Sequence, residues 1–330
     1  METEISAARM GIVVVNYGSH RLIEANLGSI DLSRLDVQVV IVDNFSSLEE
    51  RSAIEHVASS RSWSLVNLAR NEGFGAGANA GLRVAADAGC ASFLVLNPDA
   101  DVQVEVVDEL QQHCLRDRYA LVTPILVTSA GEIAFDGSQV YLDTGRIKRV
   151  RRPDGAGSRG EVISDRLLGD GRPARAWLPG TCLALHRDLL SKAGGFHEPY
   201  FLYWEDLDLS YRCQDVGGSL VIRHDLAVVH DEGGTQQRPG GRALSQRYYY
   251  WNCRNRLLFA ARHLPTRQVV RWMLHTPAES WQIVLRGGRR QLLHSPAPLV
   301  AAVRGSLAGL MIAACAVFGR RPSIRSYPVI

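Results

Sequence analysis

Two short acidic stretches carry the side chains best suited to chemistry. The first follows the apolar run Phe93–Leu96, which gives way to Pro98, Asp99 and Asp101. A buried strand that delivers two carboxylates to a loop is one way in which α/β enzymes present a hard cation to a phosphorylated substrate. Because Asp and Pro are also ordinary turn residues, a solvated acidic turn would look the same in isolation.

The second acidic stretch opens the segment Trp204–Val216, whose spacing predicts a helix. Glu205 and Asp206 fall in its first turn, where the helix dipole stabilises carboxylates by a few tenths to about 1 kcal/mol. Neighbouring residues on a helix point in different directions, so only one of the two can face a cleft as a general base. His230 follows the predicted strand Ser219–Val229, where it is either a metal ligand or a structural histidine.

Strands and helices alternate in the segments that must position these residues. Near-continuous apolar runs are typical of buried parallel strands, and strand-helix alternation predicts right-handed βαβ units with a ligand site beyond the strand C-termini. The expected elements are strands at Gly11–Tyr17, Val37–Val42, Ser64–Leu68 and Phe93–Leu96, and helices at His20–Ile30 and from the glycine-rich stretch 71–77 to Ala88. After Tyr119 strands and turns dominate, with a hairpin turn at 143–145 and a loop at Arg151–Arg175.

Composition limits the classes of protein that fit. The 330 residues are 46% hydrophobic and 22% charged, as in an ordinary globular protein. Six scattered cysteines without a CxxC pair argue against a disulfide framework and a thiolate zinc site. The N-terminal METEISAARM lacks an apolar signal-like region, so we expect a cytosolic catalytic part.

The net charge of +3 conceals a strong division along the chain. Residues 236–330 hold 15 arginines and a single acid, Glu279, whereas residues 1–235 have an excess of acids. Such a basic segment could bind nucleic acid, anionic lipid or the acidic part of its own chain. Since no nucleic-acid recognition module is present, we do not expect nucleic acid as the partner.

Six motifs occur in the same order as in a known protein family. They are Asp43-Asn44 with Ser46, Asn71–Gly75 with Asn79, Asn97-Pro98-Asp99, Gly180-Thr181-Cys182, Trp204–Asp208 and His230. Over roughly residues 11–265 the chain resembles the family 2 glycosyltransferases, most closely the bacterial rhamnosyltransferase-like branch. The resemblance implies the GT-A nucleotide-diphospho-sugar transferase fold, a mostly parallel central sheet flanked by helices. It places the catalytic domain at 1–235 and a basic helical region at 236–330.

The resemblance also implies roles for particular residues. Asp43 matches the acid that accepts a hydrogen bond from the pyrimidine ring, and Asp99 matches the last Asp of the DxD signature, which binds Mg²⁺ or Mn²⁺. Asn97 replaces the first Asp of that signature, and the spacing of Asp101 would let it compensate. His230 matches a histidine of the metal or diphosphate site. The nucleotide-sugar site is expected to comprise Val15, Asn16, Asp43, Arg70, Gly73, Asn79, Asn97, Pro98, Asp99, Gly180 and Thr181.

In the same comparison Asp206 matches the catalytic base, and Glu205 would contact the acceptor or orient its neighbour. The implied reaction is a single inverting displacement at the anomeric carbon. The implied donor is dTDP-L-rhamnose, with UDP-sugars as the alternative, and the acceptor is a polyprenyl-diphosphate-linked or other cell-envelope glycan. A non-enzymatic protein that binds a nucleotide or glycan without turnover is the other alternative.

Two further interpretations concern single segments. Gly75–Ala80 fits the dinucleotide-binding pattern G-x-G-x-x-A, with Asp99 about twenty residues further on, but at least two strands precede it and it does not follow its strand directly. The apolar stretch Pro298–Phe318, followed by Arg320 and Arg321, predicts an interfacial helix at the inner face of the cell membrane or a helix packed on the catalytic domain. Self-association stays open.

Overall fold

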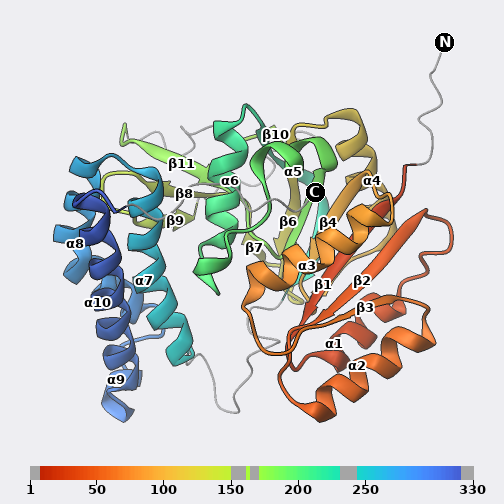
Figure 1. The fold of residues 1–330 in the computed structure, drawn as a ribbon, viewed down its shortest axis with the longest axis horizontal. Helices are drawn as coiled ribbons and strands as arrows, with labels where there is room; N and C mark the ends of the chain where they lie inside the picture. Colours follow the sequence, from red (N-terminus) through yellow and green to blue (C-terminus); the bar gives the residue numbers. More distant parts are fainter. Residues whose placement is uncertain (1–7, 150–160, 164–170, 231–243, 321–330) are drawn as a thin grey trace.

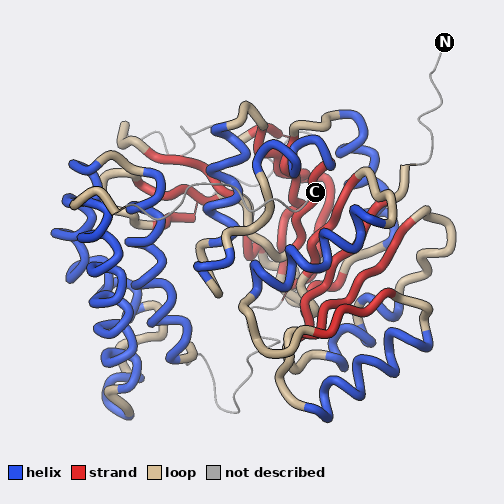
Figure 2. The backbone as a smooth tube through the Cα atoms, in the orientation of Figure 1, coloured by secondary structure: helices blue, strands red, loops and turns tan. Residues whose placement is uncertain are grey.

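A mixed β-sheet covered by helices forms the centre of the molecule, and a layer of helices stands at one end (Figures 1 and 2). The computed structural model describes residues 8–149, 161–163, 171–230 and 244–320. The strands are β1 (Met10–Asn16), β2 (Val37–Asp43), β3 (Ser64–Asn67), β4 (Ser92–Leu96), β5 (Ala100–Asp101), β6 (Ala120–Val127), β7 (Ile133–Phe135), β8 (Ser138–Tyr141), β9 (Ile147–Arg149), β10 (Glu161–Val162), β11 (Ala174–Trp177), β12 (Cys182–His186) and β13 (Ser219–His230).

The helices divide between the two faces of the sheet and the end layer. Those of the sheet region are α1 (His20–Ala25), α2 (Leu48–Ser60), α3 (Phe74–Asp87), α4 (Val104–Arg116), α5 (Arg187–Ala193) and α6 (Glu205–Asp215), with the 3-10 turns η1 (Leu27–Ser29) and η2 (Glu198–Tyr200). Those of the end layer are α7 (Gln246–His263), α8 (Thr266–Leu285), α9 (Gln291–His294) and α10 (Ala297–Val317).

The main sheet has the order β10-β13-β6-β12-β4-β1-β2-β3. Strands β3, β2, β1 and β4 are parallel, as their apolar runs predict. The sheet as a whole is mixed, because β12 runs antiparallel to both of its neighbours, β4 and β6. A second, small sheet of order β11-β8-β9 lies between the main sheet and the helical layer.

Most of the expected elements lie within a residue or two of their predicted bounds. The first helix is the exception: it stops at Ala25, and η1 continues the chain where a single helix to Ile30 was expected. The hairpin turn at 143–145 joins β8 to β9 as predicted, with Gly145 at φ +72°. The expected loop at 151–175 lies largely outside the described residues, and β11 begins inside its predicted range.

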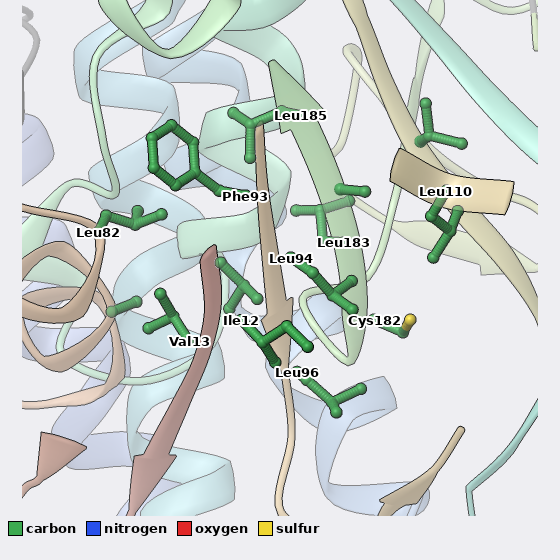
Figure 3. Packing of buried hydrophobic residues seen from close by; sticks show 14 of the residues in the cluster. Ile12, Val13, Leu82, Phe93, Leu94, Leu96, Leu110, Cys182, Leu183 and Leu185 are labelled. Atoms are coloured by element: carbon green, nitrogen blue, oxygen red, sulfur yellow. The ribbon is translucent and has the colours of Figure 1, made fainter. Parts of the chain in front are cut away.

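The largest core is built on β1, β4 and β12 and is covered by α3 and α4 (Figure 3). Glycines let α3 lie almost on the sheet: a Cβ added at Gly77 would meet the Val15 side chain at 2.9 Å, and one at Gly81 would meet Val13 at 2.4 Å. The pattern Gly75–Ala80 is therefore a helix-packing surface inside α3. This position rules it out as the strand-to-helix turn of a dinucleotide-binding fingerprint.

The end layer shares a core with the rest of the chain. Trp204 and Leu207 of the α6 region pack with Phe259 of α7 and Trp272 of α8. The predicted boundary between residues 235 and 236 lies outside the described residues. On its described parts, the helical region packs into the sheet domain and is no detached tail.

Helix α10 packs on the protein through one face and leaves another face exposed. Its small residues face α7, where a Cβ added at Gly305 would meet the Tyr250 carbonyl oxygen at 2.2 Å and one at Gly309 the Arg254 carbonyl oxygen at 2.9 Å. Several of its large apolar residues are exposed, namely Leu299, Val300, Val303, Leu307 and Met311, with Phe318 just beyond, whereas others such as Leu310 and Ile312 pack against the core. By length and composition α10 could cross a membrane, and about a third of its most apolar window is buried against the protein.

Candidate active site

The C-terminal ends of β1 and β2 bring the first predicted nucleotide residues together. Asn16 and Asp43 are register partners, and the Asn16 side-chain amide lies 3.4 Å from an Asp43 oxygen. The Arg51 Nε donates to the other Asp43 oxygen at 2.7 Å. Because the Asp43 side chain is fully buried in these contacts, recognition of a base would require its surroundings to open. Val15, the other residue predicted on this strand, is buried beneath them.

The loop after β3 is tied to this edge by Asn44. Its side chain donates to the Gly73 carbonyl oxygen at 3.0 Å and accepts from the Glu72 N–H at 2.9 Å. Gly73 has φ +89°, and a Cβ there would meet the Phe201 carbonyl oxygen at 2.4 Å. Glycine therefore permits close approach of the Phe201 backbone, where the sequence had led us to expect approach of the nucleotide. Arg70 is exposed and pairs with Glu72 at 2.6 Å.

Asn79 has a different place from the one predicted. It is fully buried in α3, its amide nitrogen donates to the Phe196 carbonyl oxygen at 2.8 Å, and its side-chain oxygen accepts from the Phe196 N–H at 2.8 Å. The amide nitrogen also lies 3.2 Å from a Glu198 oxygen. With both ends of the amide bound to protein, Asn79 holds the segment before α6 in place of lining a nucleotide.

The acidic end of β4 meets the start of β12 because these strands are antiparallel. The Asn97 N–H donates to the Thr181 carbonyl oxygen at 2.8 Å, which brings the predicted Gly180-Thr181 pair to the same edge. Pro98 is buried, and its carbonyl oxygen accepts from Asn26 at 2.9 Å. Asp99 follows directly, at the open end of the sheet.

Pairing of β5 with β13 sets His230 against Ala100 and so brings its ring to Asp99. His230 Nε2 lies 3.3 Å from Asp99 Oδ1. That oxygen is buried and makes no hydrogen bond to the described residues. A buried carboxylate oxygen without a donor, beside an imidazole nitrogen, fits a divalent cation whose remaining ligands are diphosphate oxygens.

Asp101 does not complete a metal cluster. Within the described residues no group of three or more His, Cys, Asp or Glu side chains is placed to hold a metal ion. The structure brings Asp99 and His230 together, whereas Asp101 lies in β5 with its backbone paired to Val229, and its predicted role as a compensating ligand stays a prediction.

The second acidic stretch lies at the start of α6. The Gly180 N–H donates to Asp206 Oδ2 at 3.1 Å, and the Leu207 N–H donates to Oδ1 at 2.7 Å. Burial raises the pKa of Asp206 to about 6, although these two N–H groups act in the opposite direction. Glu205 is more deeply buried, and burial with the nearby Asp206 charge raises the pKa of its carboxyl well above the usual range. Of the two carboxyls, Asp206 is therefore the more readily ionised.

A strained turn immediately precedes Glu205 and Asp206. Phe201, Tyr203 and Trp204 all have positive φ angles, of 65°, 66° and 75°. Side chains larger than glycine adopt this region at a cost of order 1–3 kcal/mol each, and such strain gathers at functional sites. Asn255 of α7 holds the turn, since its amide nitrogen lies within 2.9 Å of the carbonyl oxygens of residues 200, 202 and 203.

Asp208, like Asn255, is a residue whose role was not predicted from the sequence. It is fully buried and accepts from Arg212 at 2.7 Å and from Arg262 at 3.1 Å, with His263 Nε2 at 2.7 Å. These cations outweigh burial and hold the pKa of the Asp208 carboxyl well below its usual range. Because Arg262 and His263 belong to α7, Asp208 fastens the end layer to the helix that carries Asp206.

Comparison with known proteins agrees with this architecture. Residues 12–161 match the profile of the family described as Glycosyl transferase family 2. The chain is 24% identical over 254 residues to the low-salt glycan biosynthesis hexosyltransferase Agl10 of Haloferax volcanii, covering 76% of this chain and 74% of the relative. It is 27% identical over 241 residues to an N-acetylglucosaminyl-diphospho-decaprenol L-rhamnosyltransferase of Mycobacterium tuberculosis, covering 69% and 77%.

Solved structures give the same fold. A crystal structure of GalNAc-T7 with UDP, GalNAc and Mn²⁺ is similar with a TM-score of 0.55 at 14% identity, over 91% of this chain and 59% of that longer chain. The mannosyltransferase PcManGT of Pyrobaculum calidifontis, in complex with GDP-Man and Mn²⁺, is similar with a TM-score of 0.53 at 15% identity, over 95% and 88%. At these identities the likeness establishes the fold alone.

Proposed function

We propose that this chain, a glycosyltransferase with a family 2 domain over residues 12–161 and the GT-A fold, is an inverting, metal-dependent enzyme that transfers a hexose to a lipid-linked or other cell-envelope glycan. The observation that carries the proposal is Asp206, a carboxylate of raised pKa held by the Gly180 and Leu207 N–H groups at the edge where β4 and β12 meet. A base with a pKa near the working pH combines a useful ionised fraction with proton affinity.

In the proposed reaction Asp206 accepts the proton of an acceptor hydroxyl as that oxygen attacks the anomeric carbon. The bond from the anomeric carbon to the diphosphate oxygen breaks on the opposite side, so a single displacement inverts the configuration. A general base of this kind contributes typically 10²–10⁴-fold to the rate. Glu205, whose raised pKa favours the neutral acid, cannot compete for the proton and leaves this role to Asp206.

Asp99 and His230 would hold Mg²⁺ or Mn²⁺ together with the donor diphosphate. The cation would supply neutralisation of the charge that develops on the leaving diphosphate. Asp99 brings the carboxylate oxygen to this site and His230 fixes its position from the neighbouring strand.

We assign dTDP-L-rhamnose as the donor because of the similarity to an L-rhamnosyltransferase, with UDP-hexoses as the alternative. The test is a donor-hydrolysis and transfer screen of the full chain across nucleotide sugars with Mn²⁺. The proposal expects one dTDP- or UDP-sugar to be consumed at least tenfold faster than the rest, with the anomeric configuration inverted in the product. Absence of turnover with every donor would contradict it.

We also propose that the enzyme works at the inner membrane face, through the exposed apolar stripe of α10 and nearby arginines such as Arg304 and Arg320. Met311→Glu is expected to weaken binding to vesicles of anionic phospholipid at least tenfold. Leu48→Glu on α2 is the matched control, since Leu48 and Met311 are both 71% exposed. Equal binding by the two variants would contradict membrane contact through α10.

A further inference from the structure

Four paired aromatic side chains, two of which come shortly before Asp206 in the chain, have no part in the mechanism described above. Phe201 stacks on Trp251 with ring centroids 4.9 Å apart and an interplanar angle of 20°. Tyr203 meets Tyr248 edge to face at 5.3 Å. All four rings are half-buried. We call these four residues the aromatic wall.

The aromatic wall is formed where the strained turn 201–204 meets α7. Phe201 and Tyr203 precede Asp206 by five and three residues, whereas Tyr248 and Trp251 come from the first turns of α7 (Figure 1). Next to them, Arg247 Nη1 lies 3.3 Å from the hydroxyl oxygen of Tyr17, which follows β1. The first turns of α7, which carry half of the wall, therefore reach the C-terminal end of β1.

Phe201 and Trp251 are not core residues. Neither residue is a member of the three buried apolar clusters of the described chain, although Trp251 also meets Tyr250, at the margin of one of them, edge to face at 4.9 Å. The strained φ of 65° at Phe201 nevertheless persists, because Phe74 N–H and Asn255 hold the turn on either side of it. The turn therefore fixes the backbone position from which the Phe201 ring projects.

A pyranose ring is the ligand that suits such a wall. One face of a pyranose presents C–H groups, which are attracted to the electron-rich face of an aromatic ring and lose little hydration on contact. Its hydroxyl edge stays available to polar groups, and binding sites for small molecules commonly combine aromatic walls with a few polar groups in this way.

From these observations we infer that the aromatic wall, with Phe201 as its main contact and Trp251 as its support, binds the pyranose ring of the acceptor. The inference rests on the proposed transferase function and adds to it the class of acceptor and the residues that hold it. In this position an acceptor hydroxyl faces Asp206, while the donor occupies the strand ends beside Asp99.

The test compares Phe201→Ala with Phe201→Tyr in the full chain. The assay measures transfer from the preferred nucleotide sugar to a set of methyl pyranosides that includes methyl N-acetyl-β-D-glucosaminide. Phe201→Ala is expected to raise the acceptor KM at least tenfold, with donor KM and donor hydrolysis within threefold of wild type. Phe201→Tyr, which keeps the ring, is expected to restore the acceptor KM.

Trp281→Ala is the matched control, because it removes an exposed aromatic side chain from α8 and should leave both KM values unchanged. An unchanged acceptor KM in Phe201→Ala overturns the inference. So does a rise in donor KM alone, which would mean that Phe201 stacks on the nucleotide base. Wild-type enzyme that hydrolyses its donor but transfers to none of the pyranosides also contradicts it, whereas absence of donor hydrolysis in the wild type contradicts the proposed function instead.

Discussion

The donor side and the base side of the site are constructed in different ways. On the donor side the ends of β1, β2 and β4 present Asn16, Asp43 and Asp99, and hydrogen bonds between neighbouring strands fix their positions. On the base side a strained turn presents Asp206, and side chains of α7 fix that turn. The sheet alone is sufficient to place the donor groups, but the base depends on a helix from the basic end of the chain.

The largest predicted effect is a loss of folding stability, which we compare for one buried carboxylate from each side. Asp208→Ala leaves Arg212 and Arg262 without their shared partner, and breaking a buried ion pair in this way costs about 3–5 kcal/mol of folding free energy. Asp43→Ala should cost less, about 1.5–3 kcal/mol, because Arg51 is partly exposed and keeps water as a partner. Urea unfolding measures both; an equal loss would remove the distinction between the two sides.

The donor side itself can be divided by Asp99 and Asp101. Asp99→Asn should weaken Mn²⁺-dependent binding of the nucleoside diphosphate at least tenfold, because the buried Asp99 oxygen beside His230 is the proposed ligand. Asp101→Asn should change it less than threefold. Calorimetric titration of the two variants with and without Mn²⁺ measures this, and the reverse order of effects would restore Asp101 as the ligand.

Removal of Asn255 tests whether α7 positions the base. Asn255→Ala deletes the donor to three carbonyl groups of the turn and should destabilise the protein by about 1–3 kcal/mol. Because the turn carries Asp206, kcat should fall while donor KM stays within threefold. Unchanged kcat in a variant with lowered stability would assign Asn255 a purely structural role.

The last prediction concerns the pH dependence of the unmodified enzyme. Since burial raises the pKa of Asp206 to about 6, the base is ionised above that pH and becomes protonated below it. The value of kcat/KM should therefore fall about tenfold per pH unit below pH 6 and level off above it. A profile measured between pH 4.5 and 8 that stays flat through pH 6 would contradict the assignment of the base.

Local sequence patterns predicted the parts of the site that strands deliver. An apolar run followed by Asp-type residues marks a strand end, and the structure places Asn16, Asp43, Asn97 and Asp99 at one edge of the sheet. The same reasoning did not predict that the amide of Asn79 is used within the protein. Spacing identifies which residues lie near a loop but not whether their polar atoms are already bound.

The groups that hold the base left little trace in the sequence. Asn255 and Arg262 contact residues more than fifty positions earlier, and such contacts follow no local periodicity. One signal was present: α7 places Asn252, Asn255 and Arg256 among apolar residues without a clear polar face. Buried polar side chains on a helix must find partners, so this pattern could have indicated a clamp on another segment.

The measurement that tests the account most directly is the activity of Asp206→Asn. This change preserves the shape of the side chain and removes the base. Its amide oxygen can accept from only one of the Gly180 and Leu207 N–H groups, so a small loss of stability is expected beside the loss of activity. We predict that transfer falls by 10²–10⁴-fold while the protein stays folded and Mn²⁺-dependent donor binding stays within threefold of wild type. Transfer at the wild-type rate by a folded Asp206→Asn protein would contradict the account.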